Sequence, residues 1–232
     1  MRFRDRRDAG EHLARELAAL ALGPATVLAI PRGGVLVADA LVRAHDWPLD
    51  LAIPRKLRAP QNPELAFGAV TGDGTVYVDA ALARALRITD AYLRDEIGTQ
   101  IEEIERRRAA YRGARPDPDV RGRTAIVVDD GVATGATVIV TVRMLRHALA
   151  REVIAAIPVG APDALRRLER EADRVVCTLR PPSFAAVGEF YEDFHQTTDE
   201  EVVEALQRAW ARTQAARPPA SRGGPAAPDG GS

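Results

Sequence analysis

Short apolar runs alternate along the chain with longer segments in which apolar residues recur every three or four positions. The apolar runs predict buried β-strands, and they cover residues 26–30, 49–53, 124–128, 153–159 and 175–179. The amphipathic segments predict helices over residues 8–22, 35–45, 89–111, 135–150 and 163–171. This alternation predicts an α/β fold, with a mostly parallel twisted sheet flanked by helices.

Glycines and prolines interrupt this pattern between the second strand and the long helix. Residues 66–78 predict a β-hairpin, because the sequence Gly-Asp-Gly at 72–74 lies between two apolar runs. The preceding stretch, 54–63, contains three prolines and predicts an irregular loop.

The loops at 31–34 and 129–137 each follow directly from a predicted strand. In parallel sheets a ligand lies outside the carboxyl ends of the strands. We therefore expect the functional site to lie at these two loops.

The C-terminal part of the chain differs in composition from the rest. Residues 212–232 consist mainly of Ala, Pro, Gly, Arg and Ser without apolar periodicity, which is typical of a disordered tail. Residues 1–211 show no internal repeat, and we expect them to form one domain.

The charge is balanced, since 32 basic and 33 acidic residues among 232 give a formal net charge of −1. Such a balance gives no reason to expect nucleic acid or an anionic membrane as a partner. Residues 1–8 lack the apolar core of a secretory signal, and the apolar stretch 17–30 is shorter than the roughly 20 residues that span a bilayer. We expect a cytoplasmic location.

The number of cysteines and the spacing of the histidines argue against a disulfide framework and against a metal site built from these residues. The single cysteine, Cys177, excludes an intramolecular disulfide and a cysteine-rich metal site. The four histidines are scattered and have no metal-ligand spacing.

Residues 125–137 carry the strongest chemical signal. An apolar strand ends in two carboxylates, Asp129 and Asp130, and a turn of small residues then opens a helix. The backbone N–H groups of 134–137, with the hydroxyls of Thr134 and Thr137, suit a phosphate monoester. The carboxylates suit the vicinal hydroxyls of a sugar, or a divalent cation. The alternative is an ordinary strand-to-helix turn whose aspartates cap the helix.

This segment resembles the thirteen-residue signature of the type I phosphoribosyltransferases, which bind 5-phosphoribosyl-1-pyrophosphate (PRPP). Four apolar residues, two acids, a variable pair and a Thr-Gly-x-Thr ending match that signature. The resemblance implies that Asp129 and Asp130 hold the ribose hydroxyls. It also implies a site for the 5'-phosphate made by Ala133, Thr134, Gly135, Ala136 and Thr137.

The turn Pro31-Arg32-Gly33-Gly34 is similar to the pyrophosphate loop of this family. Its two glycines allow close backbone approach, and its N–H groups and the Arg32 guanidinium offer donors to a diphosphate. The family likeness implies a non-proline cis peptide bond in this turn, which we expect at Arg32–Gly33.

Residues 54–75 take the place of the mobile catalytic loop of the family. Lys56, the only lysine of the chain, lies there beside Arg55 and Arg58. The resemblance implies that Lys56 and Arg58 join Arg32 as catalytic residues. A solvated basic loop is the alternative.

A cluster of aromatic residues, Phe190, Tyr191 and Phe194, lies where the family often has its base-covering hood. The resemblance implies that these rings cover a base and that Asp193 serves a metal-bound pyrophosphate. We expect a small hood from about residues 1–10 and 181–200, around a core of about 24–180. A hydrophobic cluster that closes the end of the sheet is the alternative.

These resemblances imply a phosphoribosyltransferase that uses Mg²⁺, held mostly by oxygen atoms of the substrate. It would transfer the 5-phosphoribosyl group of PRPP to a nitrogen nucleophile, which we expect to be a nucleobase, as in nucleotide salvage. Ala133 stands where enzymes for 6-oxopurines carry an aspartate, which argues against hypoxanthine and guanine. Because dimers are usual in this family, the resemblance also implies that the chain forms a homodimer.

Two other functions fit part of the pattern. A regulatory protein that senses PRPP without turning it over would keep the binding segment. A hydrolase or isomerase of another sugar phosphate would keep the phosphate site but would not need the turn at 31–34.

Overall fold

The computed structural model describes residues 1–115 and 118–215. Its helices are α1 (Arg6–Ala18), α2 (Gly33–His45), α3 (Ala80–Ala85), α4 (Asp90–Arg112), α5 (Ala136–His147), α6 (Pro162–Leu168) and α7 (Asp199–Ala215). Its strands are β1 (Ala25–Ala29), β2 (Leu49–Leu51), β3 (Arg55–Ala59), β4 (Asn62–Val70), β5 (Val76–Val78), β6 (Thr124–Val128), β7 (Glu152–Val159) and β8 (Arg174–Leu179). A 3₁₀ turn, η1 (Val187–Phe190), precedes α7.

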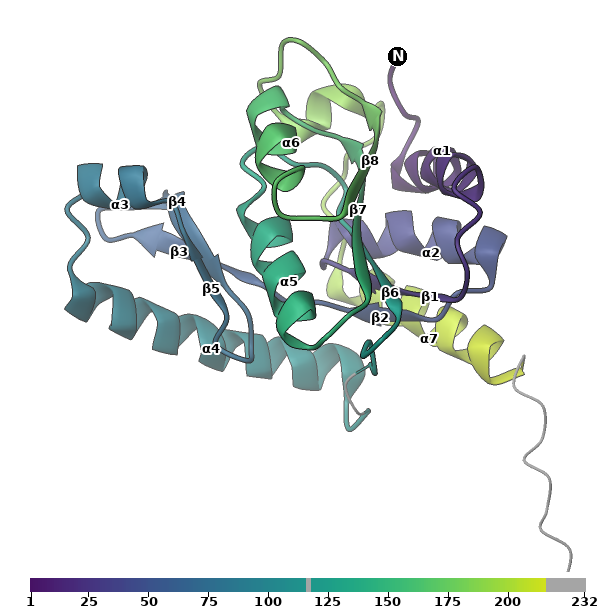
Figure 1. Ribbon diagram of the computed structural model, residues 1–232, viewed down its shortest axis with the longest axis horizontal. Coiled ribbons are helices and arrows are strands. Elements are labelled where there is room, and N and C mark those ends of the chain that lie inside the picture. Colours follow the sequence, from purple (N-terminus) through teal and green to yellow (C-terminus); the bar gives the residue numbers. More distant parts are fainter. Residues whose placement is uncertain (116–117, 216–232) are drawn as a thin grey trace, which may run out of the picture.

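Five strands form a central parallel sheet in the order β2-β1-β6-β7-β8 (Figure 1). Helices α1, α2 and α7 pack on one face of this sheet, and α5 and α6 pack on the other. Strands β1 and β6 are neighbours, with Ala29 opposite Val128. The loops that follow these strands therefore start side by side. The predicted α/β fold is confirmed.

Strand β6 shows why the sheet strands are apolar throughout. Ile126 and Val128 contribute to the core beneath α1 and α2, whereas Ala125 and Val127 contribute to the core beneath α5. Successive side chains of a strand point to opposite faces, so a strand covered on both faces has no solvent-facing position. All five residues of β6 are buried.

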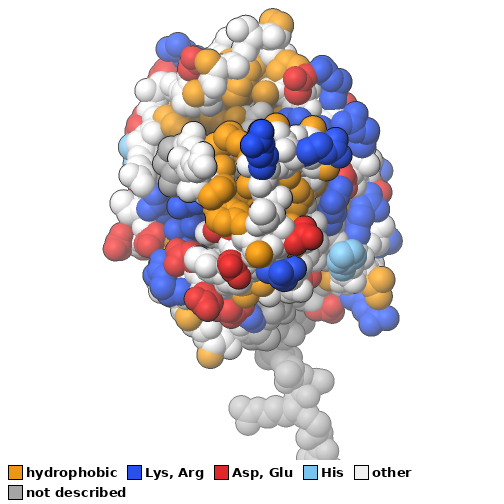
Figure 2. Space-filling model, turned by 90° about the vertical axis from the view of Figure 1, so that its left-hand side faces the viewer, with side chains coloured by type: hydrophobic (Ala, Val, Ile, Leu, Met, Phe, Trp, Pro, Cys, Tyr) orange, Lys and Arg blue, Asp and Glu red, His pale blue; other side chains and the backbone are white. Residues whose placement is uncertain are grey.

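A second sheet, β3-β4-β5, is antiparallel and lies between α4 and α5 (Figure 1). Leu57 and Phe67 of this sheet are buried against Ile104 of α4. Half-buried apolar residues of α3 and α4 complete the cluster. In Figure 2, which views the molecule from this end, hydrophobic side chains at the centre of the face are surrounded by charged ones.

The second sheet confirms one prediction and corrects another. The hairpin expected at 66–78 is present as β4 and β5. The irregular loop expected at 54–63 is wrong, because β3 and the start of β4 occupy that stretch. Leu57 and Ala59 point inward from β3, while Pro54 precedes the strand and Pro60 lies in the turn after it.

The C-terminal helix α7 was not predicted, and residues 212–215 belong to it instead of to a disordered tail. Its buried face is formed by Val202, Ala205, Leu206 and Ala209. Arg208 and Arg212 also extend to the buried carboxylate of Asp39 on α2, at 3.5 and 3.0 Å. The rest of the predicted tail, 216–232, lies outside the described residues.

The two ends of the folded chain meet beside the central sheet. Phe3 and Tyr191 form a parallel β-bridge, and the Phe3 N–H donates to the Phe190 carbonyl oxygen at 2.8 Å. Both Phe3 and Tyr191 are buried. The segments expected to form a hood therefore lie together. Among residues 1–115 and 118–215, no helix has the length and apolar character needed to cross a membrane.

The crossing of α1 and α2 gives a test of this packing. A Cβ at Gly10 would clash with the Val37 carbonyl oxygen and lie 2.8 Å from Ala40 Cβ, whereas a Cβ at Gly98 of α4 would meet nothing within 4 Å. We expect Gly10→Ala to lower the free energy of unfolding by about 1–3 kcal/mol, as overpacking does. Gly98→Ala, the matched control, should raise it by about 0.5–1 kcal/mol. Urea unfolding of both variants measures this; equal effects would contradict the crossing.

Candidate functional site

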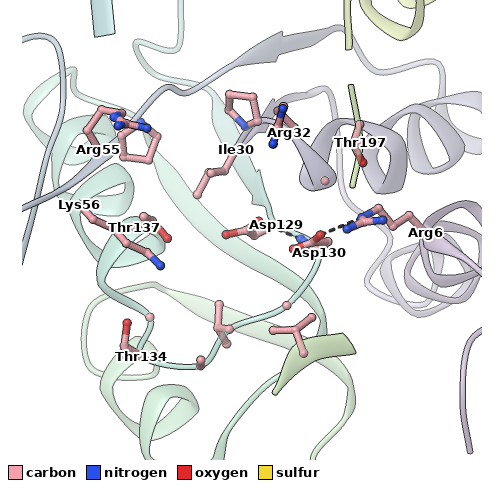
Figure 3. A pocket seen from close by; sticks show the side chains of 18 of the residues that line it. Arg6, Ile30, Arg32, Arg55, Lys56, Asp129, Asp130, Thr134, Thr137 and Thr197 are labelled. Carbon is pink, nitrogen blue, oxygen red and sulfur yellow. Dashed lines mark hydrogen bonds and ion pairs between the residues drawn. The ribbon is translucent and has the colours of Figure 1, made fainter. Parts of the chain in front are cut away.

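A cavity of about 660 Å³ opens at the carboxyl edge of the central sheet (Figure 3). Its walls come from the starts of α1 and α2, from β3, from the loop between β6 and α5, and from the segment 187–197. The sequence-predicted residues that line it are Arg32, Gly33, Lys56, Arg58, Asp129, Asp130, Ala133, Thr134, Gly135, Thr137 and Phe194. The predicted residues that do not line it are Gly34, Ala136, Phe190, Tyr191 and Asp193.

One end of the cavity is formed by the N-terminus of α5. Gly135 has a φ of +79°, which residues with a side chain rarely adopt, and α5 begins at the next residue. The N–H groups of the first helical turn have no partner inside the helix and point out from its end. The hydroxyls of Thr134 and Thr137 lie at the same end (Figure 3). This arrangement can bind a phosphate group.

Asp129 and Asp130 lie where β6 ends, beside the N-terminus of α5. The Asp130 N–H donates to Asp129 Oδ1 at 2.9 Å, and Arg6 Nε donates to Asp130 Oδ2 at 2.8 Å. Burial, and then the charge of Asp130, raises the pKa of Asp129 well above its usual range, while Lys56 and Arg6 oppose that rise. The pair can accept hydrogen bonds from the vicinal hydroxyls of a sugar.

The turn after β1 packs directly against this carboxylate pair. A Cβ on Gly33 would overlap Asp130 Oδ2, and a Cβ on Gly34 would lie 2.7 Å from the Val128 carbonyl oxygen. Glycine is therefore required at both positions by the close approach of the two loops. The structure brings together the two segments that the sequence singled out.

Arg32 lies at the start of α2 and is half-buried. Its Nη1 is 3.8 Å from Asp199 Oδ1, and that oxygen also accepts a hydrogen bond from the Tyr111 hydroxyl at 2.6 Å. Burial and this hydrogen bond raise the pKa of Tyr111 to about 12. The long ion pair leaves guanidinium donors of Arg32 available to a diphosphate. The cis peptide bond joins Pro31 and Arg32, so the expected position at Arg32–Gly33 is wrong by one bond.

Lys56 and Arg58 reach the cavity from β3 and not from a loop. Both are exposed, whereas their neighbour Arg55 is half-buried and its Nε donates to Gln100 Oε1 of α4 at 3.0 Å. The stretch 54–75, expected to take the place of the catalytic loop, consists mainly of β3 and β4 of the second sheet. Its role as a catalytic loop stays a prediction. The catalytic role of Lys56 and Arg58 stays a prediction.

Of the three aromatic residues expected to cover a base, Phe194 lines the cavity. The Arg6 guanidinium carbon lies 4.0 Å from its ring centroid. Tyr191 is buried, and its hydroxyl donates to the Asp130 carbonyl oxygen at 2.6 Å. Phe190 stacks on Phe184, with 5.5 Å between ring centroids. The alternative of a hydrophobic cluster therefore describes Phe190 and Tyr191 better, since Tyr191 is buried and Phe190 packs partly buried against the same cluster.

Arg6 and Thr197 are among the cavity residues that sequence reasoning missed. Arg6 is one of four arginines among the first seven residues, and nothing in the sequence distinguishes it from the others. Thr197 is 2% exposed, and its hydroxyl has no hydrogen-bond partner among the described residues. Both depend on the meeting of the chain ends, which local patterns do not reveal.

Asp193, expected to serve a metal, does not line the cavity. It is exposed, and its carboxylate accepts a hydrogen bond from the His195 backbone N–H at 3.0 Å and pairs with the His195 ring. Within the part of the chain that the structure describes, no three His, Cys, Asp or Glu side chains are grouped so that they could hold a metal ion. A role of Asp193 toward a metal stays a prediction.

The raised pKa of Asp129 gives a pH dependence with a definite sign. The carboxylate should become protonated on acidification at a pH where an ordinary aspartate, with a pKa near 4, is still ionised. Because the ionised form accepts the hydroxyl hydrogen bonds, the affinity for ribose 5-phosphate should fall as the pH is lowered. Calorimetric titration between pH 8 and 5 measures this. In the Asp129→Asn variant, the affinity should depend on pH only through the titration of the ligand's own phosphate. If wild type and variant show the same dependence of affinity on pH, the role of Asp129 is contradicted.

Comparison with known proteins places this geometry in a family. The family model described as the phosphoribosyl transferase domain matches residues 5–195. A protein of two Mycobacterium tuberculosis strains, CDC 1551 and H37Rv, is named provisionally as a phosphoribosyl transferase and is 41% identical over 207 residues. The match covers 89% of this chain and 47% of that protein. The chain therefore spans about half the length of these curated relatives.

Two further proteins are similar to this chain. The crystal structure of the protein TT1426 from Thermus thermophilus is 43% identical with a TM-score of 0.77, covering 90% of this chain and 99% of that one. A ribose-phosphate pyrophosphokinase of Thermococcus kodakarensis is 28% identical over 124 residues, which are 50% of this chain and 42% of that enzyme. Because the family model matches most of its length, the chain belongs to the phosphoribosyl transferase domain family.

Proposed function

We propose that this chain transfers the 5-phosphoribosyl group of PRPP to a nitrogen atom of a nucleobase and releases pyrophosphate. One observation carries the proposal. A single cavity unites a helix N-terminus suited to a phosphate, a carboxylate pair suited to a ribose, and a glycine turn with an arginine suited to a diphosphate. These are the three parts of PRPP, in the order in which they are bonded.

The proposed binding mode follows from the order of these groups. The 5'-phosphate would lie at the N-terminus of α5, with Thr134 and Thr137. The ribose hydroxyls would donate to Asp129 and Asp130, and the pyrophosphate would lie beside the start of α2, near Arg32. The close contact of Gly33 with Asp130 keeps the ribose and pyrophosphate sites adjacent.

The proposed reaction requires mainly electrostatic help. A bond forms between the acceptor nitrogen and the anomeric carbon, while the bond from that carbon to the pyrophosphate oxygen breaks and its electron pair leaves with pyrophosphate. Negative charge therefore grows on the leaving group. The proton that the acceptor nitrogen loses would pass to the released pyrophosphate or to water. Arg32, with Lys56 and Arg58 from β3, places positive charge around the cavity, and such charge stabilises the leaving group most in the transition state.

Magnesium is part of this proposal. The described residues offer carboxylates in the cavity only as the Asp129–Asp130 pair and no cluster of three ligands. That donor set fits an ion held largely by phosphate oxygens of the substrate and by water, which is the usual habit of Mg²⁺. The ion would neutralise charge on the pyrophosphate.

The acceptor side of the cavity supports a base other than a 6-oxopurine. Ala133 lines the cavity without a side chain that could exchange a proton with a base. Val187 and Gln196 also line it, one apolar and one able both to donate and to accept hydrogen bonds. This combination suits a flat heterocycle with polar edges.

The first test is calorimetric titration with PRPP and Mg²⁺. We expect the wild-type chain to bind, and Asp129→Asn combined with Asp130→Asn to weaken binding about a hundredfold or more, because each change removes the charge and replaces one acceptor oxygen by an N–H donor. Asp95→Asn, on the exposed surface of α4, is the control for the same chemical change and should bind as the wild type does. Wild-type affinity in the double variant would refute the site.

The second test separates transfer from sensing. Pyrophosphate release is followed while PRPP and Mg²⁺ are mixed with a panel of nucleobases. We expect release with one base or a few related bases. A chain that binds PRPP and releases no pyrophosphate with any base would favour the PRPP-sensing function instead.

A further inference from the structure

Arg6 connects the carboxylate pair to both ends of the chain. It is the first residue of α1, and it is 6% exposed although it lies close to the N-terminus. Its Nε donates to Asp130 Oδ2 at 2.8 Å, and its Nη1 donates to the His195 carbonyl oxygen at 2.8 Å. One guanidinium therefore joins α1, the end of β6 and the C-terminal segment (Figure 3).

Two further groups, the Phe194 ring and the turn at Gly33, also restrict the position of the Arg6 guanidinium. Its carbon lies 4.0 Å from the centroid of the Phe194 ring, in a cation–π contact. On the side of the α2 turn, Gly33 approaches so closely that a Cβ there would lie 2.7 Å from Arg6 Nε. A carboxylate, a carbonyl group, an aromatic ring and a backbone turn thus fix its position.

The orientation of Asp130 depends on this fixed guanidinium. Asp130 is adjacent to Asp129, and the two like charges repel each other. The pair of Arg6 with Asp130 offsets that repulsion and engages Oδ2, while Asp130 Oδ1 has no partner among the described residues. The side chain of Asp130 is 18% exposed, and the residue lines the cavity.

We propose that Arg6 is a positioning residue, which holds the Asp130 carboxylate so that its second oxygen accepts a hydrogen bond from a ribose hydroxyl. This inference rests on the proposed PRPP site. It assigns to the N-terminal helix a part in sugar binding, in addition to covering the cavity. It also requires the effect of Arg6 on binding to pass through Asp130.

The test compares PRPP with inorganic pyrophosphate as ligands, each with Mg²⁺, in calorimetric titrations of the full chain. In Arg6→Met, we expect the affinity for PRPP to fall about tenfold or more, because a charged hydrogen-bond partner of the carboxylate is lost. The affinity for pyrophosphate, which has no ribose, should change less than twofold. Arg6→Lys keeps the charge without the planar fork and should recover part of the PRPP affinity.

Arg4→Met is the matched control. Arg4 lies two residues earlier and pairs with Asp8 on the surface of α1, so the same charge is removed without touching the cavity. We expect its PRPP affinity to equal that of the wild type. Thermal unfolding of all variants shows whether they fold; should Arg6→Met fail to fold, Arg6→Lys carries the comparison, and wild-type PRPP affinity in that variant would then overturn the inference.

A double-mutant cycle with Asp130→Asn distinguishes positioning from direct contact. In the Asp130→Asn background, we expect the Arg6→Met change to weaken PRPP binding less than twofold further. An equal loss in both backgrounds would mean that Arg6 contacts the substrate itself, which overturns positioning. Lower thermal stability with unchanged PRPP affinity would show a purely structural role. Absence of PRPP binding by the wild type would refute the proposed function, and the inference with it.

Discussion

The parallel pairing of β1 with β6 is the constraint on which the site depends. These strands are neighbours with Ala29 opposite Val128, so the two loops that carry the chemistry leave the sheet side by side. In the sequence the same loops are about a hundred residues apart. Because both strands are covered by helices on each face, their register is fixed by burial, and a slip by one residue would reverse which side chains face each core.

Close packing of the loops then determines which residues they can contain. Gly33 lies against Asp130 and Gly34 against the Val128 carbonyl oxygen, with no space for a Cβ at either position. The same close packing places the turn at 31–34, whose N–H groups and Arg32 favour anions, next to two carboxylates that favour hydroxyl groups. A ligand that satisfies both must carry an anionic group next to hydroxyl groups, as the PRPP of the proposed function does.

The sequence predicted the parts of the structure in which local pattern and tertiary environment agree. The strands of the central sheet are continuous apolar runs because both faces are covered, and Asp129 and Asp130 stand out at the end of one run. Strand β3 was missed because only Leu57 and Ala59 face inward between charged residues. Helix α7 was missed in part because its last turn has the Ala- and Arg-rich composition of the segment after it. Arg6 could not be identified, since its burial results from contacts with residues more than a hundred positions away.

The segments expected to form a hood contact the carboxylate pair directly. Phe3 pairs with Tyr191, the Tyr191 hydroxyl donates to the Asp130 carbonyl oxygen, and Arg6 pairs with the Asp130 carboxylate. The aromatic residues that resemble a base-stacking set are thereby engaged with protein groups. A ring such as Phe194, which carries a cation on one face, cannot carry a base on that same face. A base bound as proposed would therefore depend on hydrogen bonds to its edges more than on stacking against that face, and Gln196 and Thr197 of the C-terminal segment line the cavity with groups that can form such bonds.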